Sequence, residues 1–339
     1  MVVSNFNLQA HNTFGINAVA KQFSCFSSID ELENLINQTN NSPLLILGGG
    51  SNLLFTKNYE GLVLKNEILG KTVIKEDENH VWVQVGAGEN WHDFVIYCIK
   101  NNWGGIENLS LIPGNVGASP MQNIGAYGVE IKDVFESLEA FHLTSKEVHT
   151  FNNKACKFGY RESVFKRDLK GQYVICNVTY KLTKKDHKLS TSYGAIQEEL
   201  QKMGIQEPTI SAISRAVIAI RSSKLPNPAE IGNAGSFFKN PVVSSDIFEN
   251  LQKEHPDIPH YKQADGTVKI PAGWLIEQAG WKGKVIGNTG VHKKQALVLV
   301  NYGNATGKEI FDLSETILQD VFSKLGVALE REVNIVGGI

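Results

Sequence analysis

Two glycine-rich loops contain the residues of this sequence that are best suited to binding an anion. The longer loop runs from Pro113 to Gly128 and holds four glycines and two prolines with almost no charge. Glycine permits positive φ and the close approach of a ligand, while proline fixes φ without offering an N–H. Such a loop predicts a rigid concavity of backbone amides, which suits an anion. A long surface connection is the alternative, but apolar residues such as Val116 and Tyr127 favour a buried lining.

The shorter loop, Gly48 to Asn52, follows the apolar run 44–47, which predicts a buried strand. A strand, a glycine turn, and then a serine and an asparagine offer N–H groups and a hydroxyl to a diphosphate. Turns of this kind are also common without a ligand. The loop lacks the spacing of G-x-G-x-x-G and the lysine of a P-loop, so taken alone it leaves both interpretations open.

Hydrophobic periodicity predicts the elements that position these loops. It predicts helices over 26–39, 91–101, 195–201, 209–220, 272–280 and 307–325, the third of them after a turn at 192–194. It predicts strands over 61–66, 80–88, 134–143, 172–184, 295–303 and 329–336. Prolines and glycines interrupt the pattern over 221–243, which indicates a domain boundary near Arg221.

Composition excludes several classes of protein. With 339 residues, 42% hydrophobic residues and a net charge of -2, the chain is an ordinary globular protein with two or three domains and no basic surface for nucleic acid or an anionic membrane. No basic leader precedes an apolar run, and no run approaches the ~18 residues of a membrane span, so we expect a cytoplasmic protein. The four cysteines show no C-x-x-C and the nine histidines no ligand spacing, so we expect reduced thiols and no metal.

Seven segments together resemble the UDP-N-acetylenolpyruvoylglucosamine reductase family, in the family's order and over almost the whole chain. They are NTFGI (12–16), LGGGSNLLF (47–55), LSLIPGNVGASPMQNIGAYGVEI (109–131), FGYRESVFK (158–166), GNAGSFFKNPVV (232–243), IPAGWLIEQAGWKG (270–283) and LEREV (329–333). The chain departs from the family pattern at Arg331, where some relatives have proline, and in its three-glycine turn, where others have Gly-Glu-Gly.

The resemblance implies an α+β fold. It is the FAD-binding fold of vanillyl-alcohol-oxidase-like (PCMH-type) flavoproteins, with two FAD-binding subdomains over 1–68 and 69–221. A C-terminal α+β substrate-binding domain over 222–339 follows, and its last strand is free to pack back on the first subdomain. We expect a monomer.

The resemblance also assigns both glycine loops to FAD. Their amides would meet the pyrophosphate, and apolar residues would flank the flavin. The implied FAD-binding residues are Gly48, Gly49, Gly50, Ser51, Asn52, Pro113, Gly114, Gly117, Ser119, Pro120, Asn123, Gly125, Ala126, Tyr127 and Gly128. No histidine or cysteine lies in either loop, so we expect non-covalent FAD, with NADPH as co-substrate.

Three residues match the catalytic positions of the family. Arg161 would hold the carboxylate of the enolpyruvyl substrate, Ser236 would donate a proton, and Glu332 would act with Arg161 in stabilising the enolic intermediate. Taken singly, Arg161 suits a surface position and Ser236 a simple turn. Strand alternation places Glu330 and Glu332 on one face and does not choose between them; the family pattern selects Glu332.

The resemblance implies a UDP-sugar substrate, which the family reduces in peptidoglycan synthesis. The implied binding residues are Tyr160, Tyr193, Lys224, Asn240 and Gln295. Tyr193 lies where the longer form of the enzyme has a mobile loop, although the match over 185–200 is loose, and Lys224 alone would be an ordinary solvated lysine. Another FAD oxidoreductase of this fold is the alternative, and a silent nucleotide-sugar-binding module is a third. The motifs GSFFKNP and LEREV count against the former, and intact Arg161, Ser236 and Glu332 against the latter.

Overall fold

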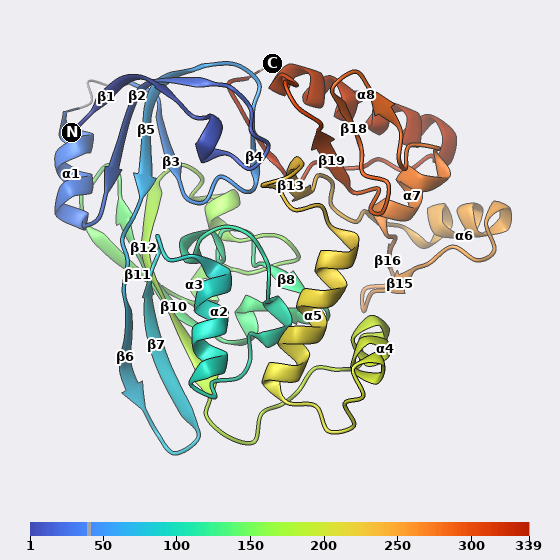
Figure 1. The fold of residues 1–339 in the computed structure, drawn as a ribbon, viewed down its shortest axis with the longest axis horizontal. Coiled ribbons are helices and arrows are strands. Elements are labelled where there is room, and N and C mark those ends of the chain that lie inside the picture. Colours follow the sequence, from blue (N-terminus) through green and yellow to red (C-terminus); the bar gives the residue numbers. More distant parts are fainter. Residues whose placement is uncertain (39–41, 339) are drawn as a thin grey trace. The chain divides into compact units, whose positions relative to one another are not determined.

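The structure is a computed structural model that describes residues 1–38 and 42–338. The chain forms two compact units, which can be followed by sequence colour in Figure 1. Unit 1 comprises Met1–Ser4, Gln22–Gly49 and Glu60–Ser223, and unit 2 comprises Asn5–Lys21, Gly50–Tyr59 and Lys224–Ile339. The expected division at residues 68 and 221 is a different partition of the chain and stays a prediction.

A four-stranded sheet in the order β1-β2-β5-β3 begins the chain. Its strands are β1 (Val3–Asn7), β2 (Val19–Phe26), β5 (Tyr59–Asn66) and β3 (Leu44–Leu47). Strand β3 runs parallel to β5, with Leu45 opposite Val63, and ends directly before the Gly48 turn. Helix α1 (Ile29–Asn37) begins where the Ser28 hydroxyl accepts the Glu31 N–H at 3.2 Å. The expected helix and strand are confirmed here, except that residue 39, the predicted helix end, lies outside the described residues.

The core of unit 1 is built on a five-stranded antiparallel sheet in the order β11-β10-β12-β7-β6. The strands are β11 (Val148–Asn152), β10 (Phe135–His142), β12 (Tyr173–Thr183), β7 (His80–Gly86) and β6 (Lys71–Glu76). Helix α2 (Trp91–Lys100) brings Trp91 and Phe94 against Tyr180 of β12, with ring centroids 5.8 and 5.2 Å away. The predicted strands over 80–88, 134–143 and 172–184 are confirmed, the first of them ending earlier, at Gly86, because alternate side chains enter this core.

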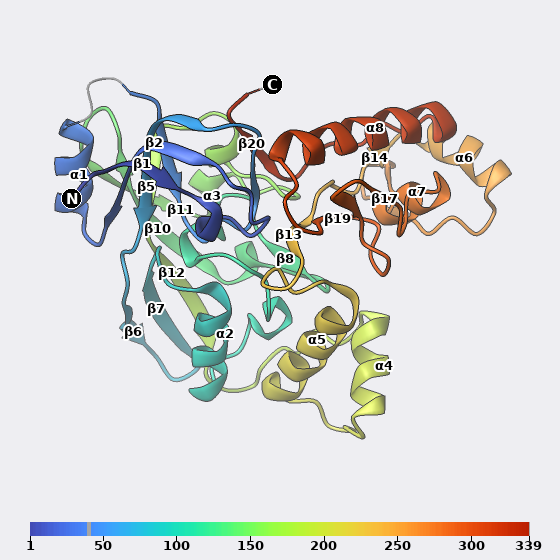
Figure 2. The same ribbon diagram turned by 45° about the horizontal axis from the view of Figure 1, so that its top comes forward.

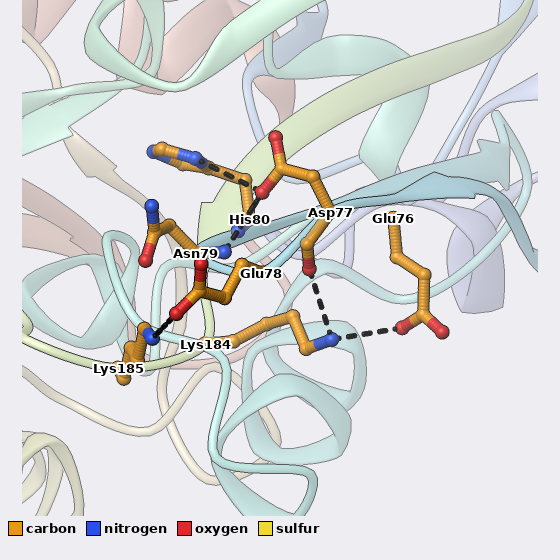
Figure 3. A network of polar contacts seen from close by, with 7 residues as sticks. All are labelled: Glu76, Asp77, Glu78, Asn79, His80, Lys184 and Lys185. Carbon is orange, nitrogen blue, oxygen red and sulfur yellow. Dashed lines mark hydrogen bonds and ion pairs between the residues drawn. The ribbon is translucent and has the colours of Figure 1, made fainter.

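Polar contacts join the tip of the β6–β7 hairpin to the segment after β12. Lys184 Nζ lies 3.1 Å from a carboxylate oxygen of Glu76, and Lys185 Nζ lies 2.6 Å from one of Glu78. Figure 3 shows the seven residues of this network: Glu76, Asp77, Glu78, Asn79, His80, Lys184 and Lys185. The pairs are largely exposed, so they set the position of the hairpin tip more than they stabilise the fold.

The remaining elements of unit 1 are short pieces around the long loop and a helical pair. The loop contains η2 (Glu107–Leu109), η3 (Val116–Ala118), β8 (Gly125–Ala126), β9 (Val129–Glu130) and η4 (Ile131–Asp133), and α3 (Asn153–Cys156) and η5 (Val164–Lys166) follow. Helices α4 (Gly194–Lys202) and α5 (Ile210–Lys224) lie side by side and pack through Ile196, Ile213 and Val217 (Figures 1 and 2). Both helices were predicted, and most of 113–128 is irregular, as predicted.

Unit 2 contains three small sheets and a long helix. The sheets are β13-β19-β18-β17, β14-β16-β15 and the parallel pair β20-β4. The strands are β4 (Leu53–Phe55), β13 (Gly232–Ser236), β14 (Val242–Val243), β15 (Tyr261–Lys262), β16 (Val268–Lys269), β17 (Val285–Ile286), β18 (Thr289–Val291), β19 (Val298–Asn301) and β20 (Asn334–Val336). The helices are η1 (Gln9–His11), α6 (Ser245–Glu254), α7 (Ala272–Gln278) and α8 (Gly307–Leu325). Helix α8 contacts β18, β19, β4 and α7.

The predicted strand over 329–336 was wrong in its extent. Arg331 forms an isolated antiparallel bridge with Phe238, and regular strand structure is limited to β20, which pairs with β4. The chain therefore changes pairing partner near Val333, and one continuous alternation does not describe it. The predicted helix over 307–325 is confirmed, because Thr306 and Glu309 form a capping box and Gly326 ends the helix at φ 66°.

Candidate active site

Within unit 1, the first two residues of the shorter glycine loop, Gly48 and Gly49, approach the longer loop backbone to backbone. A Cβ atom at Gly49 would lie 2.9 Å from Gly114 Cα and 2.9 Å from Asn115 Oδ1, so only glycine fits. Asn115 is fixed in turn, since its Nδ2 donates to the Gly88 carbonyl at 3.0 Å. Within residues 1–38 and 42–338, the backbone N–H groups of Gly48, Gly49, Gly114 and Asn115 donate to no protein acceptor. The predicted juxtaposition of amides is present in this part of the site.

Several polar side chains of the long loop hold the loop itself together. Asn123 Nδ2 donates to the Glu130 carboxylate and to the Gly159 carbonyl, both at 3.0 Å, and Asn123 Oδ1 accepts the Lys132 N–H at 3.2 Å. The Ser119 hydroxyl lies 2.7 Å from the Tyr180 hydroxyl. Gly117 is required because a Cβ there would lie 2.6 Å from the Ala87 methyl. These contacts determine the shape of the loop.

Tyr127, near the end of the loop, makes a hydrogen bond through its backbone and a ring contact through its side chain. Its φ is 51°, and its carbonyl accepts from Asn108 Nδ2 at 3.3 Å. Its ring makes an edge contact with Tyr193, with centroids 5.4 Å apart. Asn108 also donates to the Ser190 carbonyl, while its buried Oδ1 accepts no hydrogen bond from the described residues. Tyr193, directly before α4, is therefore next to the long loop.

Arg161 lies in a tight turn between α3 and η5. Gly159 and Glu162 exchange backbone hydrogen bonds across the turn, and Arg161 has a φ of 53°. Arg161 Nη2 donates to the Gly125 carbonyl at 2.6 Å, and the guanidinium carbon lies 5.5 Å from the centre of the Tyr160 ring. The turn thus places Arg161 and Tyr160 against the long loop within unit 1.

Ser236 ends strand β13 in unit 2, at an irregularity in the pairing with β19. The register shifts between Asn233 and Ser236, and Gly235 has a φ of 69°. Such a bulge turns the following side chain away from the regular direction of the strand. The Ser236 hydroxyl is partly exposed and has no hydrogen bond within the part of the chain that the structure describes.

Glu332 lies on the segment that pairs next to Ser236. Its N–H donates to the Phe237 carbonyl at 2.8 Å, and its carbonyl accepts from Asn52 Nδ2 at 3.3 Å. The preceding Glu330 is 72% exposed and forms an ion pair with Lys239 Nζ at 2.6 Å. Unit 2 therefore brings Ser236, Glu332 and Asn52 together, and the Asn52 side chain contacts the peptide backbone near Glu332. Arg161 belongs to unit 1.

Asn240 and Gln295 both lie beside the first turn of α7. Asn240 Oδ1 accepts the Ala272 N–H at 2.9 Å, and a Cβ at Gly273 would lie 3.1 Å from Gln295 Oε1. Lys224, the last residue of α5, is exposed. The structure thus places two of the predicted substrate residues beside one helix turn.

Two residues near the long loop were not predicted. Arg221 of α5 donates from Nε to the Leu111 carbonyl at 3.2 Å, and His92 Nδ1 of α2 accepts the Leu111 N–H at 2.9 Å. Burial lowers the pKa of the His92 imidazole, the Arg221 charge lowers it further, and Asp93 opposes this. The only signal in the sequence was an arginine at the end of the apolar run TISAISRAVIAI.

The described residues contain no cluster of three or more His, Cys, Asp or Glu side chains that could hold a metal ion. None of the helices among them is long and apolar enough to cross a membrane.

Comparison with known proteins identifies the chain at the level of its family. The family model for the C-terminal domain of UDP-N-acetylenolpyruvoylglucosamine reductase matches residues 227–336, and a model for an FAD binding domain matches residues 20–150. UDP-N-acetylenolpyruvoylglucosamine reductase of Flavobacterium johnsoniae is 55% identical over 99% of both chains. The enzyme of the same name from Bacteroides fragilis is 47% identical over 98% of this chain and 99% of its own.

A solved structure has the same fold. The UDP-N-acetylenolpyruvylglucosamine reductase of Thermus caldophilus matches 99% of this chain and 98% of its own with a TM-score of 0.68, at 23% identity. The expected fold class, an FAD-binding α+β region followed by a C-terminal α+β domain, is confirmed. From the extent and identity of these matches, the chain belongs to the UDP-N-acetylenolpyruvoylglucosamine reductase family.

Proposed function

We propose that this protein reduces the enolpyruvyl ether of UDP-N-acetylenolpyruvoylglucosamine to UDP-N-acetylmuramate, with NADPH as reductant and FAD as cofactor, in peptidoglycan precursor synthesis. The observation that carries this proposal is the 55% identity to a reductase of that name over 99% of both chains. A monomeric state and a cytoplasmic location stay predictions.

The residues of unit 1 fit FAD. Four backbone N–H groups without a protein acceptor among the described residues lie where Gly49 meets Gly114, and such donors suit a pyrophosphate. Asn108, 1% exposed, has a buried carbonyl oxygen that would accept the N–H of a heterocycle. When bound, FAD supplies hydride transfer between NADPH and the enolpyruvyl group. Neither glycine loop contains a histidine or cysteine, in keeping with non-covalent binding.

Arg161 would hold the carboxylate of the enolpyruvyl group. Hydride addition to the terminal carbon leaves negative charge on the carbon that carries the carboxylate, and a planar guanidinium can bind both carboxylate oxygens. The hydrogen bond from Nη2 to Gly125 and the contact with Tyr160 support this role, because they fix the direction of the side chain before substrate binds.

Ser236 would donate a proton to that same carbon. A general acid must direct its hydrogen at the carbon that it protonates. A hydroxyl that already donates a hydrogen bond within the protein would have to break that hydrogen bond first. The bulge at Gly235 and the lack of a hydrogen-bond partner for the Ser236 hydroxyl among the described residues support this assignment.

Glu332 would act with Arg161 on the enolic intermediate. The alternative residue, Glu330, already forms an ion pair with Lys239 and is mostly exposed, which makes it a poor candidate for a substrate contact. Both backbone groups of Glu332 are hydrogen-bonded, to Phe237 and Asn52, and this supports a fixed position for Glu332.

For the UDP-sugar we propose Tyr160, Tyr193, Lys224, Asn240 and Gln295. Lys224 is exposed and could neutralise diphosphate. Asn240 and Gln295 lie beside the same helix turn, which supports a shared role.

An anaerobic experiment with two half-reactions tests the function. Purified protein should be yellow with releasable FAD, NADPH should bleach it, and UDP-N-acetylenolpyruvoylglucosamine should restore the oxidised spectrum. Bleaching without restoration by the substrate would contradict the proposal and favour another flavin oxidoreductase. A protein that takes up no FAD would exclude both.

A further inference from the structure

Arg221 contacts both ends of the long loop of unit 1. Its Nε donates to the carbonyl of Leu111, which precedes the loop, and its guanidinium interacts electrostatically with the hydroxyl of Tyr127 near the loop's end. The arginine itself comes from the last turns of α5. One planar group therefore connects three segments that are far apart in the sequence.

Both residues that Arg221 contacts have a backbone conformation that L-residues disfavour. Leu111 has a φ of 58° and Tyr127 a φ of 51°. Neither is glycine, so surrounding contacts must maintain this conformation. For Leu111, His92 accepts the N–H and Arg221 donates to the carbonyl. For Tyr127, Asn108 donates to the carbonyl and Arg221 interacts with the hydroxyl. Arg221 is the contact that the two ends share.

The charge of Arg221 has no opposite charge next to it. No carboxylate in residues 1–38 and 42–338 forms an ion pair with it, and the charged group that acts on it is another cation, Arg161. Burial lowers the pKa of the Arg221 guanidinium and Arg161 lowers it further, while Tyr127 opposes this. A partly buried cation without an anion is unfavourable in the free protein, so this arrangement suits a ligand that brings negative charge.

We propose that Arg221 is a positioning residue that fixes both ends of the long loop. Its positive charge, which no carboxylate of the described residues neutralises, would also bind an anionic group of the ligand. The inference rests on the proposed function. The anion has two possible sources with the same chemistry: negative charge on FAD, or the carboxylate of the enolpyruvyl substrate. The experiment below separates them.

The test compares Arg221→Met, Arg221→Lys and Arg215→Met in the FAD-loaded protein. Arg215 is exposed on the same helix and serves as the matched control. We measure FAD release on dilution, its dependence on salt, the midpoint potential of the bound flavin, and KM for the substrate. Loss of a charge-assisted contact in R221M should weaken FAD binding or raise KM about ten- to a hundred-fold, whereas R215M should equal wild type.

The variants distinguish the two sources. If the anion belongs to FAD, R221M releases FAD faster, loses the salt dependence of release and has a lower midpoint potential, and R221K restores part of each. If the anion is the substrate carboxylate, the FAD readouts of R221M change little while KM rises, and R221K restores part of KM. Unchanged FAD release, potential and KM in R221M would overturn the inference.

Tyr127→Phe provides a variant that does not depend on R221M folding. It removes only the hydroxyl that Arg221 contacts, and we expect faster FAD release than from wild type. Wild-type protein in the same experiment separates this inference from the proposed function. If wild type neither holds FAD nor is reoxidised by the substrate, the proposed function fails. If wild type does both and R221M and Y127F match it, only the role of Arg221 fails.

Discussion

Four non-glycine residues in the left-handed region of φ lie in the long loop or beside it. Leu111, Asn123, Tyr127 and Arg161 have φ between 45° and 58°, and none is glycine. Each such residue costs on the order of 1–3 kcal/mol unless its neighbours hold it. Here the neighbours are named side chains: His92 and Arg221 at Leu111, and Asn108 and Arg221 at Tyr127. Part of the local strain in unit 1 therefore lies at the proposed cofactor site.

The role of Ser236 separates the two half-reactions. Ser236→Ala removes the hydroxyl and no protein hydrogen bond among the described residues, so reduction of the flavin by NADPH should stay at the wild-type rate. Reoxidation by the enolpyruvyl substrate should fall by about 10²–10⁴, the usual contribution of a general acid. Stopped-flow absorbance of the flavin measures both rates.

Ser222→Ala, an exposed serine of α5, is the control for this change. Equal slowing of both half-reactions in Ser236→Ala would show that the hydroxyl does not act in proton donation.

His92 should make the stability of the protein depend on pH. Its folded-state pKa lies below the ordinary value of 6.5, first because of burial and then because of Arg221, with Asp93 opposing. The unfolded chain therefore binds this proton at a higher pH than the folded chain does. The contribution of the neutral His92 side chain to the free energy of unfolding is fully present above pH 6.5. It is lost as the pH falls from 6.5 through the folded-state pKa.

Urea unfolding at pH 7.5 and pH 5.5 measures this effect. Wild type should lose more free energy of unfolding between the two pH values than His92→Asn, whose amide oxygen can still accept the Leu111 N–H but does not titrate. If the two proteins lost the same free energy of unfolding, the pH dependence would not come from His92.

At the scale of elements, Arg331 connects the Glu332 segment to helix α8. Its Nε donates to the Ser314 hydroxyl at 2.8 Å, its Nη2 lies 2.6 Å from the Glu315 carboxylate, and its guanidinium carbon lies 4.5 Å from the centre of the Phe311 ring. Its backbone pairs with Phe238, two residues after Ser236. Through Arg331 the long helix therefore helps to fix the segments of both proposed catalytic residues in unit 2.

Arg331→Met should lower the free energy of unfolding by about 1–3 kcal/mol, because it removes charge-assisted hydrogen bonds from a partly buried group and leaves the buried Ser314 hydroxyl without this donor. Lys308→Met, which breaks an exposed ion pair on the same helix, should change stability by about 0.5 kcal/mol or less. Urea unfolding of the FAD-loaded proteins gives both values. If R331M were as stable as K308M, the connection to α8 would be unimportant.

The sequence predicted the elements whose signals are local. Helix α8 was predicted because its cap residues and its period lie within the element. The glycine loops were predicted because glycine and proline restrict conformation wherever they occur. The change of partner near Val333 could not be predicted, since it depends on which strand the chain meets, and neither could Arg221, whose partners come from distant segments. The choice of Glu332 over Glu330 needed the family pattern, and the ion pair of Glu330 now supports it.

At the scale of the whole molecule, the four cysteines report on the integrity of the fold. Cys25 is exposed, while Cys98, Cys156 and Cys176 are buried. Burial raises the pKa of Cys156 to about 12 and that of Cys176 to about 11, so these thiols are both inaccessible and protonated. Burial and Glu67 also raise the pKa of the Cys25 thiol, which should slow its reaction without preventing it.

A disulfide reagent at pH 8 should therefore label one thiol in the native protein and four in urea. Cys25→Ser should reduce the native count to zero. Labelling of two or more thiols in the native protein would mean that unit 1, which contains all four cysteines, opens more readily than its core indicates.

The contacts of Asn52 and β4 affect the order in which the protein can fold as it is made. Asn52 reaches Glu332 across 280 residues of sequence, and β4 pairs with β20, whose last residue is Val336. Both units are assembled from three segments, but the longest segment of unit 1, Glu60–Ser223, is made before the longest segment of unit 2, which begins at Lys224. On the ribosome, the sheet of β10 and β12 can form while later segments are still being translated, but β4 must wait, without its partner strand, until β20 has been made. Residues 53–55 are therefore the part of the early chain that remains open to mispairing for longest.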